Sequence, residues 1–425
     1  MNSRERVRLA LEHREPDRIP LDLGAGFQTG MHVSMVYALR QALELDDPGT
    51  PIKVIEPYQM LGEIKIDLLD ALGADLVGVN PPKTMFGYKN EGWKPWTTFD
   101  GTPVLVSEYF NTQVDQNGDL LAYPEGDKSV PPSGRMPQGG FYFDSIIRQE
   151  PIDDVNLSVA DNLEEFGLIS DEDLAFFGRE VDRLYIETDR AIYANFGGTA
   201  IGDIALVPAP WLKHPKGIRD IEEWYISTLT RRNYVYQIFE QQTEISLQNL
   251  AKIFEVVGNK VQIVFLTGTD FGAQDRAFMS PKTYRDLYKP FHKAINDWVH
   301  ENTTWKTFMH SDGAILSLIP DIIEAGFDIL NPIQWTAKDM ELKLLKERFG
   351  DQLVFWGGSV DSQGTFPFGT PEQVRAEVLQ SIRDLAPGGG YIFNSIHNIQ
   401  PGTPIENLLA FYETIQEHRQ YPIVT

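Results

Sequence analysis

The sequence predicts one α/β domain over residues 1–425, in which eight strands alternate with helices as a (β/α)8 barrel with a β-rich insertion. Three observations lead to this class. The length of 425 residues fits a large barrel with insertions. Short apolar runs alternate with helical patterns, as they do in βα units of parallel sheets. No internal repeat or flexible linker divides the chain, so separate domains are not indicated.

The expected strands are short apolar runs that end in polar turns. Three lie in the N-terminal half, at residues 19–23, 74–79 and 191–196. Five more follow in the C-terminal part, at residues 261–265, 307–309, 328–330, 353–356 and 391–393. Eight βα units match a (β/α)8 barrel, and an open doubly wound sheet is the alternative.

The helices between these strands carry start and stop signals. Ser280 precedes a proline and opens a helix that Pro290 should bend. Capping boxes are expected at residues 370–373 and 403–406, where Thr is followed three residues later by Gln or Glu. Residues 219–257 predict two or more consecutive helices before the fourth strand.

Residues 93–148 interrupt the alternation and form the expected β-rich insertion. This segment is rich in aromatic residues, Gly and Pro, and has hairpin-type turns at Asp100-Gly101 and Asn117-Gly118. It could cover an active site, or it could be a decorative or subunit-contact segment. The sequence leaves both interpretations open. If the segment contacts a second subunit, the protein would be a homodimer.

Charge and composition exclude several classes of function. The formal net charge of −24 argues against a nucleic-acid-binding face and against attraction to anionic membranes. Without cysteine there is no disulfide, thiolate nucleophile or Cys-ligated metal. The N-terminus does not resemble a signal peptide, and no apolar run is long enough to span a membrane. We therefore expect a cytoplasmic protein.

Polar residues follow the expected strands at nearly every position. The C-terminal ends of barrel strands converge on one mouth, where catalysis takes place in this fold. The residues that would gather there are Asp22, Asn80, Asn195, Asp270, His310, Asp312, Asn331, Gln334, Asp361, Asn394 and His397.

His310 and Asp312 are the strongest catalytic candidates. Residues two apart in an extended segment point to the same side, so both side chains could reach one centre. An imidazole with a carboxylate suits a zinc site or an acid–base pair. Asp270 and His397 could complete the set, and without cysteine any metal here would have only His and carboxylate ligands. The alternative is a histidine that hydrogen-bonds within its own loop.

A glycine-rich segment at residues 24–30 superficially suggests a dinucleotide-binding loop. Its spacing is GxGxxxG rather than GxGxxG, and Phe27 is bulky where a backbone would approach a pyrophosphate. We interpret it as a strand-to-helix turn.

Several motifs together resemble the uroporphyrinogen decarboxylase superfamily. The chain start through residues 15–20 (EPDRIP) resembles the beginning of these proteins. The other similar segments are residues 269–274 (TDFGAQ), 279–281 (MSP), 310–313 (HSDG), 355–358 (FWGG), 387–391 (PGGGY) and 397–400 (HNIQ). The resemblance covers most of residues 1–80 and 260–420, and it implies a (β/α)8 barrel.

Members of the superfamily that this sequence resembles have at least two activities. True decarboxylases need no cofactor and carry an arginine-rich motif with an RQAGR core, which is missing here: residues 21–24 read LDLG. Corrinoid-linked methyltransferases that act on a thiol use an H-x-C motif and a later Cys. Here the first position reads His310-Ser311-Asp312, and His397 lies near the second. Replacing sulfur by oxygen and nitrogen puts thiol activation in doubt.

The methyltransferase branch therefore implies the leading hypothesis. A methyl group would move from a small methylated ether or amine to a corrinoid protein, as in an O-demethylase. His310, Asp312 and Asp270 would be catalytic, and a zinc ion, if bound, would be held by His310, Asp312 and His397. No covalently bound cofactor is expected, because the partner protein supplies the corrinoid. The expected substrate-binding residues are Asp22, Asn195, Gln334, Asn394 and His397.

Two alternatives stay open. One is a cofactor-independent decarboxylase acting on a porphyrinogen or another carboxylated compound at the same mouth. The other is a non-catalytic barrel that binds a tetrapyrrole or a partner.

Overall fold

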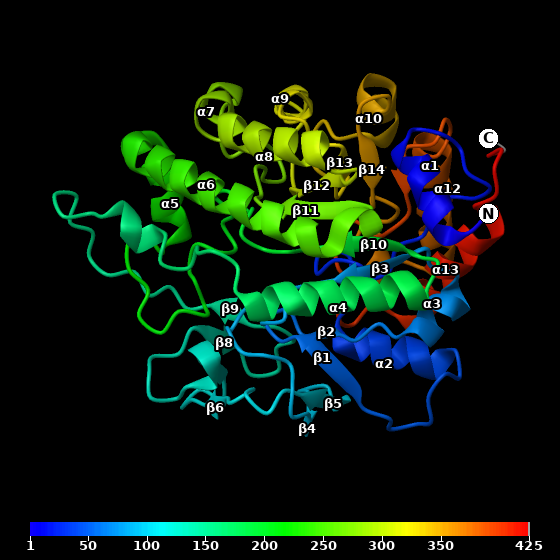
Figure 1. Ribbon diagram of the computed structural model, residues 1–425. Helices are drawn as coiled ribbons and strands as arrows, with labels where there is room; N and C mark the ends of the chain where they lie inside the picture. Colours follow the sequence, from blue (N-terminus) through cyan, green and yellow to red (C-terminus); the bar gives the residue numbers. More distant parts are fainter. Residues whose placement is uncertain (424–425) are drawn as a thin grey trace.

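A computed structural model describes residues 1–423 and shows a parallel barrel at the centre of the molecule (Figure 1). Seven strands pair in the order β15-β14-β13-β12-β11-β10-β3. Their bounds are β3 (Leu76–Val79), β10 (Ala191–Ala194), β11 (Ile263–Thr267), β12 (Lys306–His310), β13 (Ile329–Asn331), β14 (Val354–Trp356) and β15 (Tyr391–Ile392). Each of these strands overlaps a strand expected from the sequence.

The first expected strand closes the barrel between β15 and β3. Leu21 forms a parallel bridge with Phe393 on one side. On the other side its carbonyl accepts a hydrogen bond from the Asp75 backbone N–H at 2.8 Å. The (β/α)8 barrel is therefore confirmed, and the open sheet is wrong.

Helices surround this sheet, and those that lie side by side include α4 with α6 and α12 with α13 (Figure 1). Their bounds are α1 (Ser3–Leu11), α2 (Val33–Ala42), α3 (Ile66–Leu72), α4 (Asp171–Glu187), α5 (Ile221–Thr230), α6 (Arg232–Val257), α7 (Pro281–Leu287), α8 (Lys289–Asn302), α9 (Ile319–Glu324), α10 (Leu342–Phe349), α11 (Thr365–Phe368), α12 (Pro371–Leu385) and α13 (Ile405–His418).

The helix signals are confirmed with one exception. The helix that contains Pro290 is broken at Tyr288 into α7 and α8, and Thr370 forms the expected capping box with Gln373. The second capping box is wrong. Pro404 occupies the N-cap position of α13, so Thr403 lies one residue too early, and its hydroxyl instead donates to the Gln400 carbonyl at 2.9 Å.

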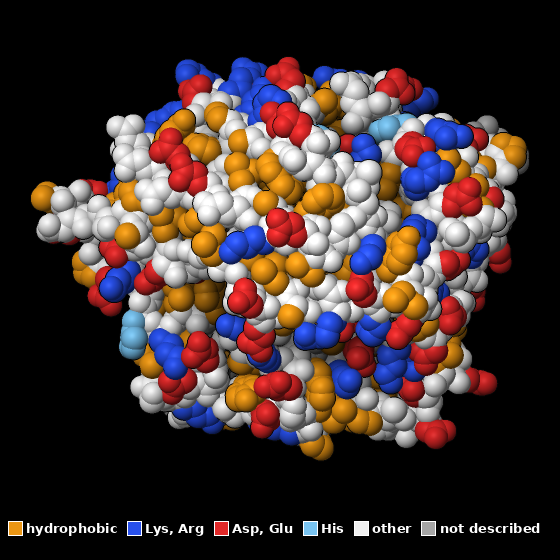
Figure 2. Space-filling model, viewed as in Figure 1, with side chains coloured by type: hydrophobic (Ala, Val, Ile, Leu, Met, Phe, Trp, Pro, Cys, Tyr) orange, Lys and Arg blue, Asp and Glu red, His pale blue; other side chains and the backbone are white. Residues whose placement is uncertain are grey.

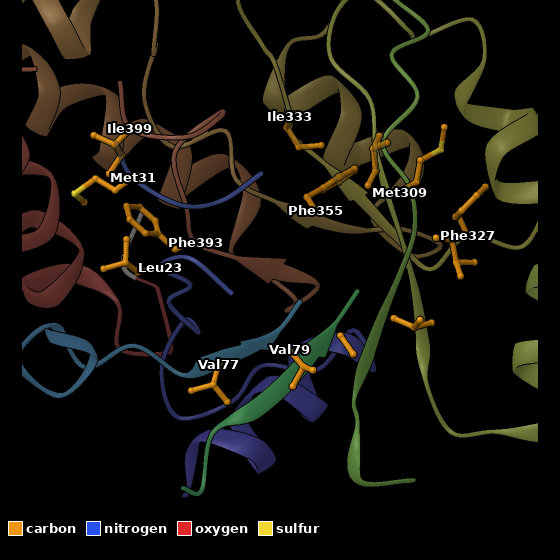
Figure 3. Packing of buried hydrophobic residues seen from close by; sticks show 14 of the residues in the cluster. Leu23, Met31, Val77, Val79, Met309, Phe327, Ile333, Phe355, Phe393 and Ile399 are labelled. Atoms are coloured by element: carbon orange, nitrogen blue, oxygen red, sulfur yellow. The ribbon is translucent and has the colours of Figure 1, made fainter. Parts of the chain in front are cut away.

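Alternate strand residues divide the core into an inner and an outer part. Aromatic side chains fill the barrel interior, where the Tyr193 and Trp356 rings each pack against Phe308. Their neighbours on the same strands point outward against the helices; Figure 3 shows two of them, Met309 and Phe355. The interior is a packed core, so only the mouth is left to bind a substrate.

The β-rich insertion forms two small sheets below the barrel in Figure 1. Hairpin turns lie at Gly101 and Gly118, both with positive φ, as expected. One sheet also recruits residues 52–62, which the sequence did not identify as strands. The strands are β1 (Ile52–Glu56), β2 (Leu61–Gly62), β4 (Lys94–Thr97), β5 (Pro103–Val106), β6 (Gln113–Val114), β7 (Leu120–Ala122), β8 (Gly134–Met136) and β9 (Asp144–Ser145).

Acidic and basic side chains are interspersed over the face of the molecule drawn in Figure 2. Many of the basic groups are paired with carboxylates, as in the contacts of Arg219 with Glu165 and of Lys289 with Glu324. Within residues 1–423, no helix combines the length and the apolar character needed to cross a membrane.

Glu56 gives a stability prediction at the edge of this insertion. The side chain is fully buried, and its carboxylate accepts the backbone N–H groups of Tyr58 and Gln59 at 3.1 and 2.7 Å. Burial raises its pKa from 4.5 to about 7, so the folded state binds more protons than the unfolded state between those values. Stability should therefore fall as the pH rises through this range.

We expect the Glu56→Gln variant to lose less stability than the wild type between pH 5 and 8, by about 1–3 kcal/mol. Urea unfolding at both pH values measures this difference. Equal losses in the two proteins would contradict the argument.

Candidate active site

The site is built around His310, the last residue of β12. Phe308, two residues earlier, points into the barrel, so His310 also points inward, and its side chain is almost fully buried. Its Nδ1 lies 2.7 Å from the Asn331 Oδ1 on β13. The Asn331 Nδ2 donates to the Trp356 carbonyl, which leaves Oδ1 as an acceptor for His310. The imidazole is therefore fixed, with Nε2 directed toward the mouth.

Asp312 and His397 complete a compact group of three side chains. The Asp312 Oδ2 lies 3.4 Å from the His310 Nε2 and 3.9 Å from the His397 Nε2. The centroids of the two imidazole rings are 5.3 Å apart, and the ring planes are inclined at 69°. One donor atom from each residue lies within 4.8 Å of the others. The structure thus brings together the three residues predicted as metal ligands.

Asp270 supports this group from the loop after β11. Its Oδ1 accepts the Asp312 backbone N–H at 2.8 Å, and the Tyr225 hydroxyl donates to its backbone carbonyl at 3.0 Å. The Ser311 hydroxyl in turn accepts the Phe271 N–H at 2.9 Å. These bonds tie the ends of β11 and β12 together and hold the Asp312 backbone in place.

The charges in this group depend on one another. Burial opposes a charged His310, but the hydrogen bond and charge of Asp312 outweigh it and raise the pKa of His310 to about 9. Burial would raise the pKa of Asp312, yet His310 holds it below the usual value. Burial and then the Asp312 charge raise the pKa of Asp270 to about 6, and burial lowers that of His397. His310 and Asp312 therefore form an ion pair at neutral pH.

A cavity of about 270 Å³, which we call the mouth cavity, opens above Asp312 and His397. Gln334 also lines it, and its Oε1 accepts the Gly313 N–H at 2.7 Å. The remaining lining residues are polar with one exception; they are Gln274, Thr336, Asp361, Ser362, Ile396, Gln363 and Gln400. Two of the five expected substrate-binding residues, Gln334 and His397, thus face a space where a small molecule fits.

The other three expected substrate-binding residues take part in bonds within the protein. Asp22 is buried and accepts from the Trp356 Nε1 at 3.1 Å and the Ala25 N–H at 3.1 Å. Asn394 donates to the Asp22 carbonyl at 3.0 Å, and Asn195 accepts the Gly197 N–H at 3.0 Å. They do not line the mouth cavity, and their contact with substrate stays a prediction.

The glycine-rich segment after the first strand is a turn, as expected. The Gly24 N–H donates to the Thr29 carbonyl at 2.9 Å, and Gly24 has a positive φ. A side chain at Gly26 would meet the Tyr193 ring at 2.9 Å, so this glycine permits close packing against the barrel interior.

Asp203 is a site-proximal residue that the sequence did not reveal. It is nearly buried and accepts the N–H groups of Gly268 and Ala205 at 3.2 and 3.0 Å. Burial raises its pKa, and the charge of His310 opposes that rise. It lies in the long loop after β10, where no pattern marks which polar residue folds inward.

The three clustered residues fit a zinc ion. Zinc bonds to His nitrogen and carboxylate oxygen of about 2.0–2.2 Å place tetrahedral ligands roughly 3.4 Å apart. The separations around Asp312 are 3.4 and 3.9 Å, and all three ligand atoms lie within 4.8 Å of one another, so the first matches this spacing and a small shift of the side chains would bring the others to it. The hydrogen bond from the His310 Nδ1 to Asn331 also gives Nε2 the orientation that a metal ligand needs.

Asn331 provides a test of this orientation. We expect Asn331→Leu to lower zinc affinity by about 10- to 100-fold, because the imidazole loses the acceptor that fixes it. Competition with a chromophoric chelator measures the affinity. An unchanged affinity in a folded variant would show that Asn331 does not position His310.

Comparisons with known proteins agree with this architecture. The model of the uroporphyrinogen decarboxylase (URO-D) family matches residues 204–418, half of the chain. The chain belongs to the uroporphyrinogen decarboxylase family. The matched region contains β11 to β15 and all three clustered residues.

Named relatives within this family are distant. The uroporphyrinogen decarboxylase of Prochlorococcus marinus (strain NATL2A) is 24% identical over 288 residues, which cover 65% of this chain and 74% of the relative. That of Synechococcus sp. (strain CC9605) is 33% identical over 135 residues, covering 32% and 36%.

A solved structure described as a methyltransferase from Methanosarcina mazei has the same overall fold. The TM-score is 0.54 with 15% identity, and the match covers 98% of this chain and 99% of the other. At this identity the likeness bears on the fold alone.

Proposed function

We propose that this protein is a methyltransferase component that moves a methyl group from a small methylated donor to a corrinoid protein. The observation that carries the proposal is the group His310, Asp312 and His397, of which Asp312 and His397 line a small polar cavity. By the family resemblance, His310 and Asp312 occupy the H-x-C motif of the thiol-activating site in corrinoid-linked methyltransferases, and His397 lies near the place of the later Cys. Here nitrogen and oxygen replace sulfur, which suits a donor with a harder heteroatom, an ether or an amine.

The residues supply the proton that the leaving group of an ether needs. When the methyl carbon leaves, its bonding electrons stay on the heteroatom, and the reduced corrinoid provides the electron pair that bonds the methyl group. His310 is charged at neutral pH, and its Nε2 lies 3.4 Å from the Asp312 Oδ2. Asp312 lines the cavity, so the His310–Asp312 pair can deliver a proton to that heteroatom. Asp312 stabilises the charged imidazole before transfer. A zinc ion held by His310, Asp312 and His397 would instead supply Lewis-acid activation of the heteroatom.

The character of the cavity also bears on the alternative reaction. Curated relatives carry the name uroporphyrinogen decarboxylase, so a decarboxylase is the second candidate. A substrate with several carboxylates needs cationic partners. Among the described residues that line the mouth cavity there is neither Lys nor Arg, whereas Asp312 and Asp361 are both present. This favours a donor without negative charge.

The test mixes the purified protein with a reduced corrinoid protein and candidate methyl ethers or amines. We expect the absorbance of the methylated corrinoid to appear together with an equal amount of demethylated donor. Mixtures that lack the protein serve as the control. If no donor of either class yields methylated corrinoid, the proposal is wrong.

A further inference from the structure

A second cavity, of about 280 Å³, lies between the β-rich insertion and the barrel mouth. Residues from four parts of the chain line it: the start of α2, the segment from the turn after β1 into β2, the segment that leads into β9, and residues 398–401 after β15. Gln400 lines both this second cavity and the mouth cavity, so the two spaces adjoin. The remaining lining residues are His32, Tyr58, Gln59, Leu61, Tyr142, Phe143, Asp144, Asn398, Ile399 and Pro401.

Aromatic side chains and one carboxylate give this second cavity its chemistry. Four lining residues are aromatic, namely His32, Tyr58, Tyr142 and Phe143, and the Phe143 ring also packs against Phe86. The His32 Nδ1 accepts the Ser34 N–H and its Nε2 lies 2.9 Å from the Phe141 carbonyl, which is the bonding pattern of a neutral imidazole.

Asp144 is the acidic group among the lining residues. Burial raises the pKa of Tyr58, and the charge of Asp144 adds to this rise. No ion pair of Asp144 occurs within residues 1–423. Arg135 stands opposite Asp144 in the β8–β9 pair, and its guanidinium donates to the Asp119 carboxylate at 2.6 Å. Asp119 is the main cause of the raised pKa of Arg135, and the charge of Asp144 contributes less. Within the described lining, no Lys or Arg balances the Asp144 charge.

We propose that the second cavity binds the alkylated ammonium group of a cationic substrate. Aromatic faces attract such groups through their negative quadrupole, and a carboxylate at the rim adds a direct charge interaction. The neutral amides of Gln59, Asn398 and Gln400 can border such a group without opposing its charge.

This inference rests on the proposed function for its place in a reaction. The ammonium group would lie in the second cavity, and the reacting end of the same molecule would extend past Gln400 to Asp312 and His397. Binding energy from the non-reacting cation would then hold the methylated end beside His310. The β-rich insertion would thereby select the substrate, since Tyr142 and Asp144 belong to it.

Isothermal titration calorimetry with choline tests the inference without any corrinoid protein. The comparison ligand is 3,3-dimethylbutan-1-ol, which has the same shape without the charge. We expect choline to bind about tenfold more tightly than the alcohol. Equal affinities for the two ligands would overturn the inference. Because no methyl transfer is measured, a failure here is distinct from a failure of the proposed function.

Two variants locate the binding. Asp144→Asn and Tyr142→Ala should each weaken choline binding several-fold. Asp144→Asn should leave binding of the uncharged alcohol nearly unchanged. Both residues are exposed, and Tyr142 is 46% exposed, so neither change should unfold the protein. Glu108→Gln and Tyr109→Ala are the matched controls, because they alter the same insertion outside the cavity. Choline affinity that is unaffected by Asp144→Asn would also overturn the inference.

Discussion

Replacing His310 by alanine should lower the rate of methyl transfer by about 100-fold or more, with little loss of stability. In the proposed chemistry the imidazole acts either as the proton donor or, if zinc is bound, as a ligand of the zinc ion. Its Nδ1 is hydrogen-bonded to Asn331 and its Nε2 is paired with Asp312, and alanine can make neither contact. Stopped-flow absorbance of the corrinoid measures the rate, and thermal unfolding measures the stability.

His214→Ala is the matched control for this change. His214 is exposed and lies outside the mouth cavity, so its removal should leave the rate unaltered. A folded His310→Ala protein with wild-type activity would remove the residue on which the proposed chemistry depends.

Asp312→Asn is expected to have the second large effect, a loss of zinc affinity of about 100-fold with a similar fall in the rate. Asparagine keeps the shape of the side chain and the backbone bond to Asp270, but it lacks the negative charge that a metal ligand and the His310 imidazolium both require. Zinc retained after dialysis against a chelator, determined by elemental analysis, measures the first effect.

Asp361→Asn is the matched control, because it removes a negative charge from the mouth cavity without removing a predicted zinc ligand. Asp361 lines the same mouth cavity but is not one of the three clustered residues. We expect this control to retain zinc. Equal zinc content in Asp312→Asn and the wild type would contradict the ligand assignment.

The barrel could be predicted because each strand carries its own local signal. An apolar run followed by a polar turn marks residues 261–265 or 353–356 without reference to the rest of the chain. The strands within residues 52–62 carry no such local signal. β1 pairs in parallel with β5, about fifty residues later, and this partner cannot be recognised from the local pattern.

The site was predictable to the extent that barrel geometry brings strand ends together. The ends of β12 and β15 meet at the mouth, which places His310 near His397 although 87 positions separate them in the sequence. Other polar residues at the strand ends form hydrogen bonds within the protein and do not line the mouth cavity. The sequence does not show which residues these are, because the bonds depend on the conformation of the folded turns. Asp22 accepts from Trp356 and Ala25, and neither bond has a sequence signal.

Transfer of an isotope-labelled methyl group is the most direct test of the central proposal. A donor with a ¹³C-methyl group is incubated with the protein and a reduced corrinoid protein, and a parallel sample contains a ¹³C-carboxyl porphyrinogen. The proposal predicts ¹³C-methyl on the corrinoid in the first sample and no labelled carbon dioxide from the second. Labelled carbon dioxide without any methylated corrinoid would contradict it and establish the decarboxylase instead.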